Sequence, residues 1–75
     1  MDEHELDARG LSCPLPVLKA QKRMRPLATG DRLVVLATDP KAPGDFEAFC
    51  VERGHVLCSI VETAGVFTVT IEKKG

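Results

Sequence analysis

The chain contains no tryptophan, no tyrosine and only three phenylalanines among its 75 residues. An aromatic platform on which the bases of a single-stranded nucleic acid could stack is therefore not expected. The formal net charge is -1, so we expect no general attraction to nucleic acid or to an anionic membrane surface. No apolar run approaches the roughly 20 residues of a membrane span, and the acidic start of the chain does not resemble a secretory signal peptide.

Cysteine is scarce and odd in number, since only Cys13, Cys50 and Cys58 occur. Three cysteines cannot form a closed set of disulfides, which favours a reduced, cytoplasmic protein. His4 and His55 lie at no spacing from these cysteines that is typical of zinc ligands, so we expect no metal and no other cofactor. Cys50 and Cys58 stand on apolar stripes of the sequence, and we interpret both as core residues.

The remaining composition indicates one domain over residues 1–75. Hydrophobic residues make up 44% and charged residues 28% of the chain, which is typical of a folded protein with one modest core. Hydrophobic periodicity and turn residues predict strands at 4–8, 32–37, 55–63 and 66–72 and helices at 14–25 and from about 40 or 44 to 53. The order βαβαββ predicts an α/β two-layer sandwich in which the first two strands are parallel. Because the last two strands alternate as if half exposed, the two helices should cover one face of the sheet.

Apolar stripes predict which faces of these elements are buried. The expected stripe of the first helix consists of Val17, Ala20, Met24 and Leu27, and that of the second helix of Phe46, Phe49 and Cys50. Strict alternation would place Val56, Cys58 and Ile60 on one face of the third strand, and Leu57, Ser59 and Val61 on the other. Asp39 and Pro40 suit the N-cap and first position of the second helix, which Gly54 should end.

One thiol stands at the predicted start of the first helix. Pro14 suits the first helical position, which makes Cys13 the N-cap and places Pro16 at the third position. The amides of Leu15 and Val17 are then free to point at the Cys13 sulfur, near about half a positive charge at the helix N-terminus. We therefore expect the pKa of Cys13 to lie below the value of about 8.5 for free cysteine. Because cysteine is a poor N-cap, we interpret Cys13 as a reactive thiol rather than a small buried hydrophobe.

Charge is segregated on the first predicted helix, which carries no acidic residue. Leu15 falls on its basic face beside the thiol. Such a face is most often simply solvated, but the leucine makes it a candidate docking surface for an acidic partner. Its basic residues are Lys19, Lys22 and Arg23.

Arg9 and Asp39 follow the first two strands, whose carboxyl ends should meet near Cys13. Each either supports the site or serves only as a turn or cap residue. The motif at the thiol is not C-x-x-C, because Pro16 holds the position of the second cysteine. A thioredoxin-like dithiol cycle would therefore lack its resolving partner.

The segment at 6–16, LDARGLSCPLP, resembles the signature of the TusA-like (SirA/YedF) sulfur-carrier family. Further matches lie at 37–40, 45–50 and 54–55, so the resemblance covers nearly the whole chain. It implies two helices on one face of a four-stranded mixed sheet in the order 1-2-4-3. The resemblance also implies that Cys13 accepts a sulfane sulfur from a cysteine desulfurase or a rhodanese-like protein, holds it as a persulfide and passes it to an acceptor protein.

In this family, such a relay supplies tRNA thiolation, molybdenum-cofactor synthesis or sulfur oxidation, and residues 41–44 depart from the pattern of the tRNA-thiolation members. We expect a monomer that acts as one component of a sulfurtransferase relay and does not bind nucleic acid directly. The amides of Leu15 and Val17 would hold the persulfide anion as a helix N-terminus holds phosphate. Two alternatives stay open at this stage: a regulatory or nucleic-acid-binding module, and a redox sensor that pairs Cys13 with Cys50 or Cys58 at a Cα distance within about 7 Å.

Overall fold

The computed structural model describes residues 2–74 and has the predicted element order βαβαββ. The elements are β1 (Glu3–Ala8), α1 (Leu15–Met24), β2 (Arg32–Ala37), α2 (Ala42–Arg53), β3 (Val56–Thr63) and β4 (Val66–Glu72). The predicted ranges of β2 and β4 are confirmed, whereas β1, α1 and β3 differ from prediction by one residue at one or both ends.

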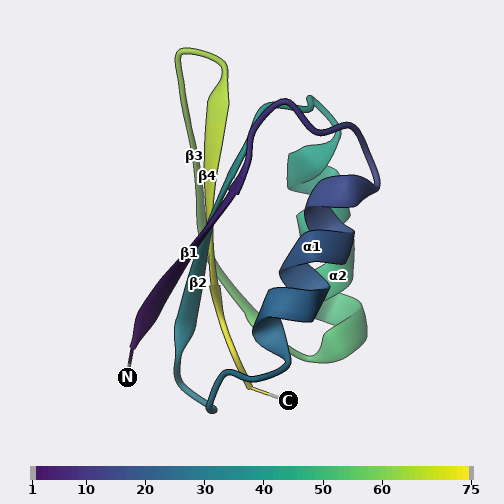
Figure 1. The fold of residues 1–75 in the computed structure, drawn as a ribbon. Helices are drawn as coiled ribbons and strands as arrows, with labels where there is room; N and C mark the ends of the chain where they lie inside the picture. Colours follow the sequence, from purple (N-terminus) through teal and green to yellow (C-terminus); the bar gives the residue numbers. More distant parts are fainter. Residues whose placement is uncertain (1, 75) are drawn as a thin grey trace.

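The four strands form one mixed sheet in the order β1-β2-β4-β3. β1 and β2 are parallel, and β4 is antiparallel to both of its neighbours. Both helices lie on the same face and leave the other face open (Figure 1), which confirms the two-layer sandwich. Because β1 and β2 point the same way and each leads into a helix, the starts of α1 and α2 lie at one edge of the sheet.

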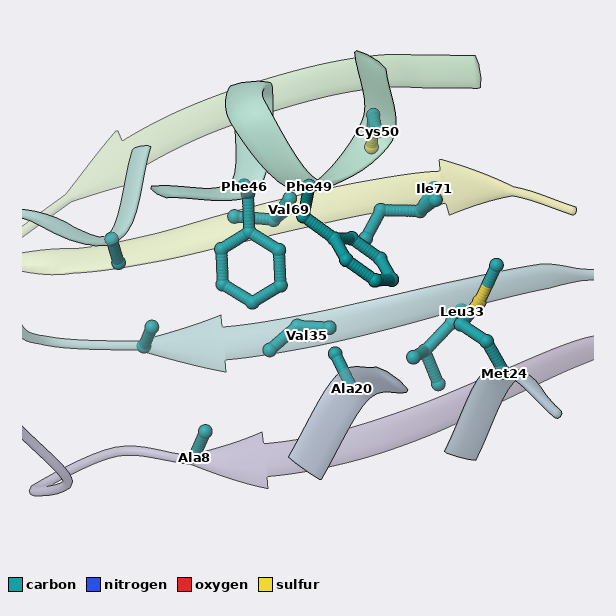
Figure 2. Packing of buried hydrophobic residues seen from close by; sticks show 12 residues of the cluster. Ala8, Ala20, Met24, Leu33, Val35, Phe46, Phe49, Cys50, Val69 and Ile71 are labelled. Carbon is teal, nitrogen blue, oxygen red and sulfur yellow. The ribbon is translucent and has the colours of Figure 1, made fainter. Parts of the chain in front are cut away.

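The core lies between the sheet and the two helices (Figure 2). β2 supplies its centre, because Leu33 and Val35 face the helices and are fully buried, while Val34 and Leu36 are only half-buried. Phe46 is also fully buried and meets Phe49 edge-on, with ring centroids 6.5 Å apart. Cys50 belongs to this cluster, so the prediction that it is a core residue is confirmed.

Helix α1 packs through the predicted stripe, since Ala20 and Met24 are buried and Val17 is partly buried against the core, and Leu27, which follows the helix, also packs there. Its far end is held by Lys73, whose ammonium group donates to the carbonyl oxygens of Met24 and Arg25 at 2.9 Å each. These are carbonyls that a helix C-terminus leaves without a partner. The end of α1 is therefore bound to the residue that directly follows β4.

Helix α2 begins at Ala42 with Lys41 as its N-cap, so Asp39 is not the N-cap and Pro40 is not the first helical residue, contrary to prediction. The prediction for the other end is confirmed, since Gly54 ends the helix in the left-handed region at φ 74°. Glycine adopts this conformation without the steric cost that a Cβ atom brings. The N–H of His55 then donates to the carbonyl oxygen of Cys50 at 3.0 Å.

Strand β3 contains an irregularity that the alternation of its sequence did not reveal. Its pairing with β4 shifts register between Leu57 and Ser59, so Cys58 is an extra residue of the kind found in a β-bulge. Leu57 and Ile60 consequently both pack against the core, although strict alternation predicted them on opposite faces. Cys58 is exposed, and its prediction as a core residue is wrong for this reason.

Candidate functional site

Cys13 lies in the connection between β1 and α1, at the edge of the sheet where the loops after β1 and β2 lie together (Figure 1). Gly10 turns the chain at φ 79°, and its N–H donates to the Thr38 hydroxyl oxygen at 2.9 Å. This hydrogen bond links the two loops. The Cys13 side chain is exposed, as expected for a reactive thiol rather than a buried hydrophobe.

The helix begins later than predicted, which changes the surroundings of the sulfur. Pro14 is the N-cap and Leu15 the first helical residue, so Cys13 stands one position before the cap, with a cis peptide bond to Pro14. The N–H of Leu15 donates to the carbonyl oxygen of Ser12 at 2.9 Å and is therefore not free to hold a sulfur anion, contrary to prediction. Pro16 is buried against the core side of the helix. The corresponding role of the Val17 amide stays a prediction.

Asp39 holds the backbone of the thiol residue. The N–H of Cys13 donates to its Oδ2 at 2.6 Å, and the N–H of Lys41 donates to its Oδ1 at 2.8 Å. These two hydrogen bonds stabilise the carboxylate and lower the pKa of Asp39 below its usual value. Of the two strand-end residues predicted as site support, Asp39 thus contacts Cys13 directly.

Asp45 holds the thiol itself. The Cys13 S–H donates to Asp45 Oδ2 at 2.8 Å. This hydrogen bond raises the pKa of Cys13 above its usual value, and the negative charges of Asp45 and Asp39 add to the effect while Lys41 opposes it. The predicted lowering of the Cys13 pKa is therefore wrong for the sulfur-free thiol, because the hydrogen bond to Asp45 stabilises its protonated form.

Sequence reasoning missed Asp45 because it lies 32 residues from Cys13. The topology held a usable signal. Parallel strands that each precede a helix bring both helix N-termini to one sheet edge, and Asp45 is the acidic residue in the first turn of α2. An acidic residue there should therefore be expected near a thiol at the start of α1.

A groove of about 270 Å³ runs from the thiol between the two helices. Cys13 and Asp45 lie at its end nearest the sheet edge, and Val17 of α1 and Phe49 of α2 line it farther along. The lining continues on α2 through Glu52 and Arg53, which carry opposite charges. The sulfur is thus reachable both from open solvent and along an inter-helical groove.

The basic face of α1 is exposed, as predicted, and carries more apolar surface than the sequence pattern indicated. Leu15 is 45% exposed and Leu18 is 50% exposed. Leu18 was not among the predicted docking residues, yet it lines a groove of about 400 Å³ together with Lys19 and Lys22. Arg23 is also exposed.

Arg9 points its guanidinium group at Asp7, with Nε–Oδ1 and Nη2–Oδ2 distances of 2.9 Å each. This ion pair and the N–H of Arg9 lower the pKa of Asp7 to about 2. The Asp7–Arg9 pair is exposed and local to one turn of chain. Arg9 is therefore bound to Asp7 at the end of β1. That Arg9 supports the thiol stays a prediction.

All three cysteines are free. Cys50 is buried in α2, and Cys58 lies in β3 near the end of the sheet that is remote from Cys13, since its neighbours pair with Thr70 and Ile71. Neither is placed beside the Cys13 thiol, so the structure does not favour the redox-sensor alternative.

One group within residues 2–74 brings metal-ligand atoms together, namely one atom each of Asp2, His4 and Asp31 within 4.8 Å. It lies at the start of β1 and β2, at the opposite end of the sheet from Cys13. Both Asp31 oxygens already accept backbone N–H groups, from Asp2 at 3.0 Å and from Ala28 at 3.1 Å. We interpret Asp31 as a residue that ties these chain segments together.

The described residues thus form a small two-layer α/β protein in which an exposed thiol stands before the first helix and the other two cysteines lie in different elements. Within the described residues, no helix is long and apolar enough to cross a membrane.

Comparison with known proteins gives the family. The profile of the family described as Sulfurtransferase TusA matches residues 4–73, and the chain belongs to this family. The sulfur carrier protein TusA of Allochromatium vinosum is 44% identical over 71 residues, which cover 95% of this chain and 93% of that protein. A Neisseria meningitidis serogroup A protein, named as a candidate sulfur carrier, is 53% identical over 74 residues, which cover 99% of this chain and 100% of that protein.

The fold agrees with this assignment. The crystal structure of a SirA-like protein from Desulfitobacterium hafniense superimposes with a TM-score of 0.83 at 28% identity, and the match covers 92% of this chain and 95% of that chain. The family resemblance and the sheet order 1-2-4-3 expected from the sequence are therefore confirmed. The protein is a sulfur carrier, and the regulatory or nucleic-acid-binding alternative is not favoured. A carrier of this kind works between a sulfur donor and a sulfur acceptor.

Proposed function

We propose that Cys13 is the residue that holds the transferred sulfur, as a persulfide. The observation that carries this proposal is the position of Cys13, which is exposed before α1. Its backbone N–H donates to Asp39, and its S–H donates to Asp45. Cys50 is buried, and Cys58 is an exposed bulge residue on the strand farthest from β1. Cys13 thus combines an exposed thiol with hydrogen bonds from its backbone N–H and its S–H to two carboxylates.

The proposed transfer is redox-neutral and needs one thiol. The Cys13 thiolate attacks the terminal sulfur of a donor persulfide, a new S–S bond forms, and the donor cysteine leaves with the electron pair as a thiolate. The Cys13 proton passes to solvent and the donor thiolate takes one up. In the second half, an acceptor thiolate attacks the terminal sulfur on Cys13, whose own sulfur is then the leaving group.

We further propose that the exposed face of α1 docks the partners. Leu15 and Leu18 supply apolar area there, and the ammonium groups of Lys19 and Lys22 supply positive charge on the same helix. A partner with an acidic rim around an apolar centre fits this face. The donor is a cysteine desulfurase or a rhodanese-like protein, and the three free cysteines support a reducing, cytoplasmic setting. The acceptor belongs to tRNA thiolation, molybdenum-cofactor synthesis or sulfur oxidation.

The test is the intact mass of the protein after incubation with a cysteine desulfurase and cysteine, and separately with a rhodanese and thiosulfate. The proposal expects a gain of one sulfur atom that reductant removes and that maps to the peptide containing Cys13. Cys13→Ser should abolish the gain, whereas Cys58→Ser, which removes the other exposed thiol, should retain it. Uptake by the Cys13→Ser variant, or no uptake from either donor while Cys13 remains free to alkylate, would overturn the proposal.

A further inference from the structure

The carrier thiol has an acidic neighbour at hydrogen-bond distance. Asp45 Oδ2 accepts the S–H of Cys13 at 2.8 Å, and it comes from the first turn of α2 rather than from the loop that carries the thiol. The other charged groups around the sulfur are Asp39, which is engaged with the backbone N–H of Cys13, and Lys41. Glu52 and Arg53 carry opposite charges farther along the groove.

We propose that Asp45 biases the carrier toward giving up its sulfur, because its carboxylate binds the empty thiol and repels the loaded persulfide anion. The inference rests on the proposed function, in which Cys13 holds the sulfur. It assigns Asp45 a role in the free energy of the loaded state, in addition to its contact with the resting thiol.

The two states of Cys13 present different groups to the carboxylate. The empty thiol has one proton on Sγ, and a hydrogen bond from that proton to an ionised acceptor is stronger than a bond between neutral groups. In the persulfide, Sγ is bonded to carbon and to the terminal sulfur and has no proton to donate. A persulfide is more acidic than a thiol, so at neutral pH the loaded site adds a negative charge beside the charge of Asp45. Loading therefore replaces an attraction by a repulsion.

This difference enters the exchange equilibrium with any acceptor thiol. In the exchange, the Cys13 persulfide anion and glutathione react to give the Cys13 thiol and the glutathione persulfide anion. The S–S bond to Cys13 breaks, a new S–S bond forms on the glutathione sulfur, and the proton of the glutathione thiol ends on Cys13, with no net oxidation. Asp45 stabilises the product side through the Cys13 S–H and destabilises the reactant side through charge repulsion. Discharge is favoured as a result.

The experiment measures this equilibrium by mass spectrometry for the wild-type protein and for Asp45→Asn and Asp45→Ala. The proposal expects both variants to retain more sulfur, with the equilibrium shifted at least about threefold toward the loaded protein, as for one charged hydrogen bond at an exposed site. Glu47→Gln is the matched control, because it removes the same charge from α2 two positions away, where the side chain faces a different direction. It should leave the equilibrium unchanged.

A second readout separates this role from a merely structural one. The rate of alkylation of Cys13 by iodoacetamide, measured against pH in the sulfur-free protein, should have its midpoint at lower pH in Asp45→Asn than in the wild type. If wild type and Asp45→Asn load equally and share one exchange equilibrium, the role of Asp45 is overturned while the carrier function stands. If the wild type takes up no sulfur although Cys13 alkylates, the proposed function is overturned and the discharge bias with it.

Discussion

Asp39 accepts the backbone N–H of Cys13 at 2.6 Å across a sequence separation of 26 residues. Its other carboxylate oxygen accepts the N–H of Lys41 at 2.8 Å. One side chain therefore positions the loop that carries the thiol relative to the loop that leads into α2. The placement of Cys13 against Asp45 depends on this link, because Asp45 belongs to the helix that follows.

Replacing Asp39 by asparagine tests this link. Asparagine has one carbonyl oxygen, so it can accept only one of the two N–H groups. We expect amide hydrogen exchange at Cys13 or at Lys41 to accelerate by about fivefold, the effect of losing one hydrogen bond. Asp7→Asn is the control, since within the described residues the hydrogen bonds of the Asp7 carboxylate go to Arg9 and not to the loop of the thiol. Unchanged exchange at both amides in Asp39→Asn would contradict this account of the loop.

Charge reversal tests the docking face of α1. Lys22→Glu should lower the rate of sulfur loading from a cysteine desulfurase by about tenfold at low salt, because favourable charge steers the association of proteins. The difference should shrink as salt screens the charges. Arg32→Glu makes the same charge change at the start of β2, on the sheet face away from the helices, and should load at the wild-type rate. Equal loss of rate in both variants would indicate a general charge effect instead of docking on α1.

Cysteine labelling tests the positions of the three thiols. In the folded protein at pH 8, iodoacetamide should alkylate Cys13 and Cys58, which are exposed, and should leave Cys50 unmodified. Burial raises the pKa of Cys50 to about 11, so both access and thiolate formation are restricted there. Peptide mapping by mass spectrometry locates the labels, and all three cysteines should react in denaturant. Labelling of Cys50 as fast as Cys58 without denaturant would refute the assigned burial.

Two glycines of α2 should respond to alanine in opposite directions. An added Cβ meets no atom within 4 Å at either Gly44 or Gly54, so only backbone conformation distinguishes the sites. Gly54→Ala should lower the free energy of unfolding by about 1–2 kcal/mol, because an L-residue is strained at φ 74°. Gly44→Ala lies inside the helix and should raise it by about 0.5–1 kcal/mol. Denaturant unfolding measures both, and a loss at Gly44 equal to that at Gly54 would be inconsistent with the helix end described.

His55 should make stability depend on pH near neutrality. Burial lowers its pKa below the usual value, with help from the charges of Lys73 and Arg53, and its Nδ1 accepts the N–H of Lys74 at 3.2 Å. Between the folded pKa and about 6.5, the unfolded chain binds the proton more readily, so stability rises with pH and is complete above about 6.5. We expect the melting temperature to fall on acidification through this window, and to fall less in His55→Asn. Parallel pH profiles for the two proteins would show that His55 is not responsible.

The sequence alone was sufficient wherever the deciding interactions are local. β2 and β4 match their predicted ranges because an apolar run and a regular alternation each describe a strand without reference to its partners. The end of α2 at Gly54 follows from the conformational freedom of one residue. Cys13 was singled out from the nine residues 10–18 alone, because the prolines there predict the start of a helix and cysteine is an unusual residue at such a start.

Tertiary structure decided what depends on residues that are distant in the chain. The helix N-terminus was expected to lower the pKa of Cys13, but packing brings Asp45 from 32 residues away to the sulfur, and the hydrogen bond to its carboxylate raises that pKa. Alternation placed Cys58 in the core, but the register of β3 is set by its pairing with β4, and one extra residue turns Cys58 to solvent. The sequence by itself therefore determined the fold and the family and singled out Cys13 as the candidate thiol, because these rest on local patterns and a contiguous motif. The protonation of that thiol was decided only by the folded chain, because electrostatic interactions depend on distance in space and not on distance along the sequence.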